Sequence, residues 1–414
     1  MGCAASVYAV GRKQRKNIPE VTVFVPSIRV PLQSDLQRKL RGLIPNNLAD
    51  RISSLRNQIV LVAEDTGGSA IGELQHALEQ YLSLVLGLTK KEHGLQELVE
   101  FKWKTLDGKQ ETCVANSWFE LLCVLHMMAM LALSEASLKL IPKSSSTSEK
   151  FVSADSMREA IDLLLKAAGY LDFCIHDVLV RLPPDIKNSL PEDLQEAVME
   201  GLLNQALAQG TELQLGLAAS SQNATLSVKR RLACELLSYL GQAHCCLSEG
   251  NNSYGDGKKH LLFIKWKYLE AKAAAYYYHG LIVDKGTEPS SHVNAVCCFL
   301  AAEELIAESK KACLSFCLAD PVTRAPPPWG VMKHLNKKIP ETASKKYQMY
   351  GYLLDQEKGV QVLPDLPEFQ LSLKPDDYEL PSIDSSWDSE KWDIPGQSLK
   401  EHLNDCEDGM TTAA

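Results

Sequence analysis

The sequence predicts a mainly α-helical fold, built as an elongated array of long helices with a small β element near the N-terminus. Three observations lead to this expectation. Most of the 414 residues follow a helical period of 3.6 between turn signals, and several periodic stretches exceed 24 residues. Aromatic residues make up only 7% of the chain, which is low for an all-β protein. Strand-like alternation is confined to the first quarter of the chain.

Two segments predict the β element. Residues 20–31 (EVTVFVPSIRVP) alternate, are rich in valine and contain proline, so they indicate one short extended segment or a small hairpin. In Val99–Thr105, Val99, Phe101 and Trp103 alternate with charged residues before an Asp-Gly turn. The short run Ile59–Val62 is compatible with either a strand or a helix.

Amphipathic periodicity predicts the helices, and Pro-, Gly- and Ser-rich turns separate them. Small residues recur at helical spacing in several of them, a texture similar to tetratricopeptide repeats over about residues 154–318, although no fixed repeat length emerges. Helices this long bury their apolar stripes only by stacking on their neighbours. The expected helices are Gln33–Arg56, Gly72–Leu88, Ser117–Leu140, Ser153–Val180, Glu192–Ala219, Thr225–Ser248, Lys258–Val283, Ser290–Leu318 and about Val331–Lys358.

Charge is distributed unevenly along the chain. The net charge is −9, yet residues 1–16 carry +4, residues 355–414 carry −11, and the long body between them is close to neutral. A nucleic-acid-binding protein would concentrate Lys and Arg on its folded surface, so the pattern argues against a nucleic-acid partner. A basic tip on a neutral body fits a protein whose N-terminus meets an anionic membrane surface.

The first residues carry signals for lipid attachment. After removal of Met1, Gly2 can accept myristate, and Ser6 stands where the acyltransferase pattern requires Ser or Thr. Myristate alone binds membranes only reversibly, so a second signal is needed. Cys3 can accept palmitate, and four cations worth roughly 1 kcal/mol each at an anionic leaflet follow at Arg12, Lys13, Arg15 and Lys16. We therefore expect a lipid-anchored peripheral protein, partly cytosolic, rather than a spanning one.

No compact set of residues typical of an enzyme is present, so we expect no catalytic activity, no cofactor and no metal. The glycines of TGGSAIG (residues 66–72) match neither a dinucleotide-binding nor a phosphate-binding loop and are better explained as a turn beside a helix. Cys313 and Cys317 lie one helical turn apart without a second ligand pair, which favours core packing over metal binding. The apolar run Leu121–Leu133 is too short to span a bilayer and predicts a core helix.

The order of segments resembles the Bro-type domain of endosomal adaptors, the family of Alix and Brox. The similarity covers about residues 20–385, with Ala275-x-x-Tyr278-His279-Gly280 as its most specific part. It implies a boomerang-like helical domain over 19–385. From the residues themselves, we expect a lipidated basic segment at 1–18 before this domain and an acidic, disordered tail at 386–414 after it. The matching segments are Trp118–Glu120, Val124–Ala129, Ala208-Gln209, Leu232-Ala233 with Tyr239, Lys267–Gly280 and Ala295–Ala307.

The resemblance also implies a partner. Bro-type domains bind the C-terminal amphipathic helix of an ESCRT-III subunit of the charged multivesicular body protein class, and they are not catalytic. The family's apolar contact patch falls by position on Leu215, Val228 and Leu232, with Lys229 beside it. Residues 225–248 independently hold more apolar residues than one helix face requires. Either some of them are exposed for a partner, or the helix is buried on two sides.

The expected function is therefore a membrane-anchored adaptor for ESCRT-III in endosomal and multivesicular-body sorting, on the cytoplasmic face of endosomal or plasma membranes. The alternative is a generic helical scaffold that binds other peptides at a membrane. Brox-like members end in a prenylation box, whereas this sequence ends Met410–Ala414 and Cys406 lies too far from its end. The N-terminal lipid is expected to replace that anchor. Trp387 and Trp392 are either a linear motif or part of a segment that docks on its own domain.

Overall fold

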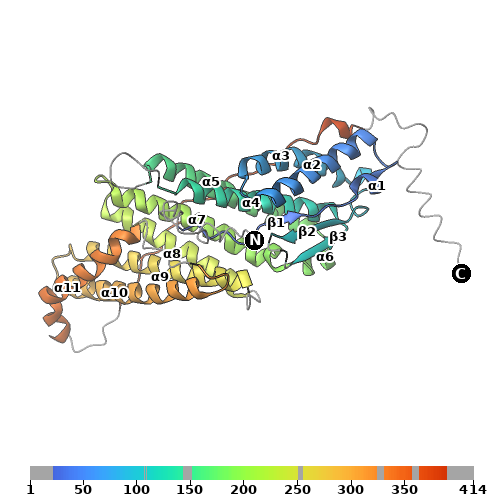
Figure 1. The fold of residues 1–414 in the computed structure, drawn as a ribbon. Coiled ribbons are helices and arrows are strands. Elements are labelled where there is room, and N and C mark those ends of the chain that lie inside the picture. The colour runs from blue at the N-terminus through green and yellow to red at the C-terminus, as the bar shows by residue number, and fades with distance from the viewer. Residues whose placement is uncertain are drawn as a thin grey trace.

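The structure is a computed structural model that describes residues 22–106, 108, 110–142, 152–249, 255–323, 331–356 and 363–388. It is an elongated helical array in which neighbours in the chain pack side by side (Figure 1). This arrangement confirms the predicted fold class. The main helices are α2 (Asn46–Thr66), α3 (Ile71–Leu88), α4 (Ser117–Lys139), α5 (Ala154–Phe173), α7 (Glu196–Ser220), α8 (Leu226–Glu249), α9 (Gly255–Val283), α10 (Pro289–Leu318) and α11 (Val331–Gln356).

The β element is a three-stranded antiparallel sheet in the order β1 (Arg29–Pro31), β2 (Phe101–Thr105) and β3 (Glu111–Val114). Val30 is opposite Lys104, and Trp103 is opposite Thr112. Only the last three residues of the predicted segment 20–31 form a strand, and Thr22–Ile28 have no regular secondary structure. The strand predicted over 99–105 is present over Phe101–Thr105 as β2, and β3, its partner after the turn, was not predicted.

The predicted helix Gln33–Arg56 is wrong, since the chain forms α1 (Leu36–Leu40) and then α2. Gly42 lies between them with a φ of 82°, a left-handed conformation that ends a helix, and Pro45 is the N-cap of α2. The ambiguous run Ile59–Val62 lies in the middle of α2 and is helical. Gly67, with a φ of 60°, ends α2, so Gly67 and Gly68 form the turn before α3, and Gly72 lies in the first turn of α3.

Helix α4 is the core of the first half of the molecule. Its N-cap Asn116 accepts a hydrogen bond from the backbone N–H of Trp118 at 2.8 Å. Among the described residues α4 alone has the length and hydropathy of a membrane span, with a mean hydropathy of 1.8, but 83% of that window is buried by other helices. Glu120, on its first turn, accepts hydrogen bonds from Arg56 and Tyr81 at 2.9 Å each. The core-helix prediction for Leu121–Leu133 is confirmed.

Short helical elements interrupt the expected pattern. The predicted helix Ser153–Val180 is α5 followed by a π-helical turn (Cys174–Val178) and a 3₁₀ turn (Leu179–Arg181). A short α6 (Pro184–Asn188) and a 3₁₀ turn (Glu192–Leu194) then lead into α7. Pro183 and Pro184 begin α6 because proline is suited to the first helical turn. Two further 3₁₀ turns are Lys91–His93 and Ser385–Trp387.

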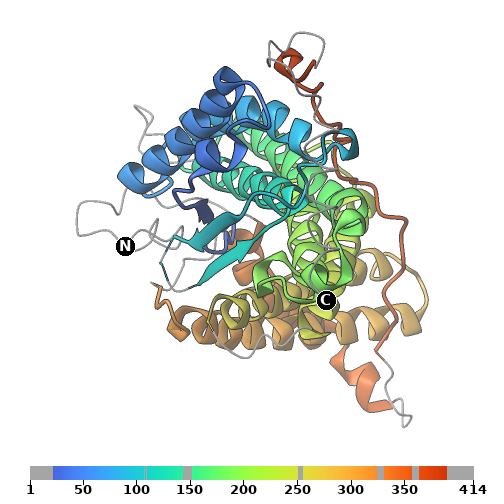
Figure 2. The ribbon, with the colours of Figure 1, turned by 90° about the vertical axis from the view of Figure 1, so that its right-hand side faces the viewer.

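Residues 363–388, which we call the strap, lie extended across the helices from α8 to α3 (Figure 2). Tyr239 on α8 donates a hydrogen bond to the Leu373 carbonyl at 2.5 Å. The strap's own backbone N–H groups then donate to α5 and α3, from Asp376 to Leu165 and from Asp384 to Ser83, at 3.2 Å each. These bonds satisfy backbone groups that an extended segment would otherwise leave unpaired.

Trp387 ends the strap in a notch on α3. A side chain at Gly87 would place its Cβ 2.0 Å from the indole Cε2, so only glycine leaves room for the ring. The indole Nε1 donates to the Leu84 carbonyl at 3.0 Å, and the ring stacks on His93 with centroids 4.9 Å apart. Trp387 thus docks on its own domain, although the sequence placed it in the tail. Trp392 lies outside the described residues.

Candidate functional site

The candidate partner-binding face lies on α8. Val228, Leu232, Glu235 and Tyr239 follow one another at i, i+4, i+7 and i+11, so they lie on one side of the helix. Val228 is 45% exposed and Leu232 is half-buried, whereas Glu235 and Tyr239 are buried. The hydroxyl of Thr225 accepts a hydrogen bond from the Val228 N–H at 3.3 Å and caps the first turn. The N-terminal half of this face is therefore open and its C-terminal half is covered.

The strap covers the C-terminal half. The Glu235 carboxylate accepts hydrogen bonds from the Ser372 backbone N–H at 2.9 Å and from the Ser372 hydroxyl. It also accepts one from Nε of Arg231 at 2.6 Å, so this buried charge is well satisfied. Burial raises the pKa of Tyr239 to about 12, with a further contribution from Glu235. The covered half of the face therefore serves to hold the strap on the helical body.

The basic residues next to the open half differ in their surroundings. Lys229 is half-buried and has no carboxylate within 4.0 Å in the part of the chain that the structure describes. The Arg230 guanidinium lies over the ring of Phe369 on the strap, 5.8 Å from its centroid. Arg230 Nη1 is also 3.4 Å from Nδ1 of His279, whose pKa is lowered by burial and by this positive charge. Among the described basic residues of this half, Lys229 therefore differs from Arg230 and Arg231 in having no such contact.

The expectation that Leu215 contacts the partner is wrong. Leu215 is 0% exposed because α7 is packed between α5 and α8, and its side chain belongs to the core. Val228, Lys229 and Leu232 lie together on the first two turns of α8, as predicted. Whether they bind a partner remains a prediction.

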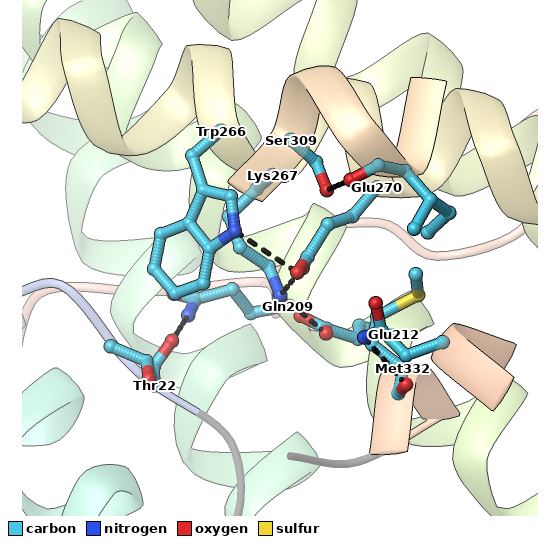
Figure 3. Close-up of polar contacts among 10 residues, drawn as sticks. Thr22, Gln209, Glu212, Trp266, Lys267, Glu270, Ser309 and Met332 are labelled. Atoms are coloured by element: carbon cyan, nitrogen blue, oxygen red, sulfur yellow. Dashed lines mark hydrogen bonds and ion pairs between the residues drawn. The ribbon is translucent and has the colours of Figure 1, made fainter. Parts of the chain in front are cut away.

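Two helices, α7 and α9, share a buried ionic cluster (Figure 3). Nζ of Lys267 on α9 lies 2.7 Å from a carboxylate oxygen of Glu212 on α7 and 2.7 Å from one of Glu270 on its own helix. The indole of Trp266 donates to Glu270 at 3.0 Å. Burial lowers the pKa of Lys267, but the two carboxylates outweigh it and the pKa is raised. The cluster is enclosed by helices and holds them in register rather than facing a substrate.

Two glutamines of α7 hold the beginning of the described chain. Gln205 donates to the Phe24 carbonyl at 2.8 Å. Gln209 donates to the Thr22 carbonyl at 2.7 Å (Figure 3). His260 on α9 lies 2.6 Å from the Gln205 side-chain oxygen, and its ring stacks on Phe24 with centroids 5.0 Å apart. The chain therefore leaves the body at a defined place. The predicted lipid and basic residues Gly2, Cys3, Arg12, Lys13, Arg15 and Lys16 lie outside the described residues.

Metal-binding side chains do not cluster in the described ranges. No group of three His, Cys, Asp or Glu side chains there could hold a metal ion. Cys317 is buried and Cys313 packs partly against the core, as expected for core thiols. His126 on α4 is buried, and burial lowers its pKa to about 4.

Comparison with known proteins places the chain in a family. The model of the BRO1-like domain matches residues 33–348. No curated protein matches the sequence. Among solved structures, an ALIX structure in complex with the SIVmac239 late domain matches with a TM-score of 0.64 and 16% identity, over 88% of this chain and 50% of that one. This chain thus spans half the length of that ALIX chain.

Two further structures cover their own chains almost completely. The ALIX BRO1 domain in complex with CHMP4C matches with a TM-score of 0.60 over 88% of this chain and 97% of that one. A Bro1 domain studied for endosomal targeting matches with a TM-score of 0.55 over 94% of this chain and 96% of that one. Both are 16% identical, so they show a shared fold. With a family match across three quarters of its length, the chain belongs to the BRO1-like domain family.

Proposed function

We propose that this chain is a non-catalytic adaptor, anchored to membranes by lipid at Gly2 and Cys3, which binds the C-terminal amphipathic helix of an ESCRT-III subunit. Membership of the BRO1-like domain family supports the proposal, as does the fold shared with an ALIX domain that was solved with CHMP4C. The observation that carries it is the open half of the α8 face, where Val228 is exposed and Leu232 is half-buried.

The chemistry of the open half suits an amphipathic helix. Val228 and Leu232 are one turn apart and offer apolar surface to the apolar stripe of a partner helix. Lys229 lies beside them and would meet carboxylates at the edge of that stripe. The strap bounds the site at Arg231 and Glu235, through its contacts at Gln370 and Ser372. A partner helix would therefore lie across the first two turns of α8.

The proposed anchor fits the way in which the chain enters the body. Gln205 and Gln209 hold the backbone of Phe24 and Thr22, so the 21 residues before Thr22 begin at a fixed point. Two acyl chains, or one with the basic run Arg12–Lys16, would give stable attachment, whereas myristate alone would not. A Brox-like member anchored at its N-terminus, on endosomal or plasma membranes, is the family type proposed.

Binding is tested with the full chain and labelled C-terminal helices of ESCRT-III subunits. The Val228→Asp/Leu232→Asp variant is expected to bind more than tenfold more weakly, because buried carboxylates in an apolar contact are costly. Leu314→Asp is the matched control, since Leu314 on α10 is also exposed, at 55%. Circular dichroism checks that each variant keeps its helices. Absence of binding by the wild-type chain to every subunit would leave the alternative, a scaffold for other peptides.

The anchor is tested by membrane partition of the full chain expressed in cells. Gly2→Ala removes the myristoylation site and is expected to move the protein to the soluble fraction. Cys3→Ser is expected to leave weaker, reversible attachment, because one acyl chain then remains. Membrane association that persists unchanged in Gly2→Ala would refute the lipid anchor without affecting the ESCRT-III proposal.

A further inference from the structure

A surface pocket lies at the other end of the strap from α8. It has a volume of about 780 Å³ and is bounded by the end of α3, the 3₁₀ turn Lys91–His93, the start of α4, the 3₁₀ turn Leu179–Arg181 and the strap itself. Trp118, Val180, Leu380 and Ile383 give it apolar walls. Val180 is 69% exposed, the largest value among the exposed large apolar side chains of the described residues. Exposed apolar side chains such as Val180 are suited to contact an apolar group of a ligand.

The charged residues around the pocket are mostly basic. Lys90, Lys91 and Arg181 line it, and Glu92 is the one acidic residue among the described lining residues. The Arg181 guanidinium lies over the Trp118 ring, 4.7 Å from its centroid, and 3.8 Å from an oxygen of Asp177. Neither lysine has a carboxylate within 4.0 Å in the described part of the chain. The pocket therefore favours a ligand that combines an apolar group with carboxylates.

The strap runs along this pocket, and the described residues end next to it. Leu380, Pro381 and Ile383 form one wall, and Trp387 is then held in the notch at Gly87, next to the pocket residue Leu86. The described chain stops one residue later, at 388. Since an extended chain covers about 3.3 Å per residue, Trp392 can reach roughly 13 Å beyond that point.

The remaining 26 residues, 389–414, have the composition that the pocket favours. They hold six acidic residues and two lysines, and the sequence Trp392-Asp393-Ile394 places an acid between two apolar side chains. Attachment next to the pocket gives this segment a high effective concentration, so even a weak contact would be populated.

We propose that residues 389–414 dock in this pocket of the same molecule, with Trp392 against Val180 and Trp118 and with acids facing Lys90, Lys91 and Arg181. The acidic segment is then a built-in ligand that a partner's acidic, aromatic peptide would have to displace. This inference is independent of the proposed function, because the pocket is separate from the open half of α8. Under this proposal, the acidic segment 389–414 occupies a pocket on the surface of its own molecule.

The test uses photocrosslinking in the full chain. Benzoylphenylalanine is placed at position 180, and crosslinked peptides are identified by mass spectrometry after irradiation. The expected product joins position 180 to a peptide containing Trp392. The same crosslinker at position 314, on the exposed side of α10, is the control and should not capture that peptide. Capture from neither position, or equal capture from both, would overturn the proposal.

A mixture of isotopically light and heavy chains identifies the source of the captured peptide. Products from one molecule contain only light–light or heavy–heavy pairs, as the proposal predicts. Mixed pairs would show docking onto a second copy and would contradict docking within one molecule.

Charge reversal provides a second, independent measurement. Lys90→Glu/Lys91→Glu/Arg181→Glu is expected to reduce the yield of the 180–Trp392 product at least fivefold, and high salt should act in the same direction. Lys310→Glu/Lys311→Glu, a pair of exposed lysines on α10, is the matched control and should leave the yield unchanged. An unchanged yield in the pocket variant would show that charge does not hold the segment there.

Discussion

The two halves of one face of α8 differ in what covers them. From Glu235 onward the face is occupied by the strap, which provides hydrogen bonds for Glu235 and Tyr239. Before it, Val228 is 45% exposed and Leu232 is only half-buried. The same helix therefore contributes polar residues where its own chain covers it and apolar residues where it is open. This difference separates a structural surface from a candidate docking surface more clearly than hydrophobicity alone.

The covering segment has its own sequence signal. Phe369, Leu371 and Leu373 alternate with polar residues, and all three pack against the core. Alternation with a period of two is typical of an extended segment with one face inward. The segment that covers this half of α8 lies more than 130 residues away in the sequence, as the hydrogen bond from Ser372 to Glu235 shows.

The largest expected effect comes from removing the tryptophan that ends the strap. Trp387→Ala should lower the free energy of unfolding by about 3–5 kcal/mol, or detach the end of the strap at a similar cost. Hydrogen exchange at the Asp384 amide, which is bonded to Ser83, distinguishes local detachment from global unfolding. A change below about 1 kcal/mol with unaltered exchange would contradict the tight docking of this segment.

Gly87 offers a second way to displace the same ring without altering the tryptophan. Gly87→Ala would bring a Cβ within 2.0 Å of the indole, so it should reproduce most of the effect of Trp387→Ala. Gly72→Ala is the matched control on α3, because nothing lies within 4 Å of a Cβ at that position. We expect it to be neutral or slightly stabilising, since alanine favours a helix.

Glu235→Ala tests the polar half of the face. Loss of the carboxylate leaves the Ser372 backbone N–H without its acceptor and Arg231 without its closest partner. The expected cost is about 2–3 kcal/mol, measured by denaturant unfolding. Val228→Ala on the open half should cost less than about 0.5 kcal/mol, because its side chain is exposed. Equal costs at both positions would remove the distinction between the two halves.

Lowering the pH should reduce the stability of the folded protein through two buried histidines. Burial lowers the pKa of His260 to about 3 and that of His126 to about 4, below the ordinary value of 6.5. Because their folded pKa values are depressed, their contribution to stability is present above pH 6.5 and is lost as the pH falls towards 4. Between pH 7 and pH 5 each histidine should cost on the order of 2 kcal/mol.

The measurement is thermal unfolding as a function of pH. His260→Gln retains an amide donor to Gln205 and should reduce the loss between pH 7 and pH 5 by roughly half, if the two histidines contribute equally. An unchanged pH dependence in this variant would show that His260 does not remain neutral in the folded state.

Much of the fold could be predicted from periodicity. The boundaries of α3, α4, α8 and α10 fall within one residue of those expected. The break between α1 and α2 was missed because Gly42 and Pro45 act through backbone conformation and not through hydrophobic pattern. The strap was not placed because composition shows that a Pro-rich acidic segment lacks a core of its own, but not which helices it will cross.

The candidate site was predicted in part. Val228 and Leu232 were expected on one face from their spacing, which the structure shows. Leu215 was transferred by position from the family's contact patch, and only packing between α5 and α8 reveals that it is buried. Burial of a residue between two neighbouring helices is a tertiary property, and the pattern of one helix cannot give it.

The central claim is that a partner helix binds the open half of α8 while the strap stays in place. Hydrogen exchange of the full chain, with and without an ESCRT-III C-terminal helix, tests it most directly. The account predicts slower exchange over about residues 225–234 and unchanged exchange at the Ser372 and Asp376 amides of the strap. Protection elsewhere with none on α8, or faster exchange of the strap on binding, would contradict it.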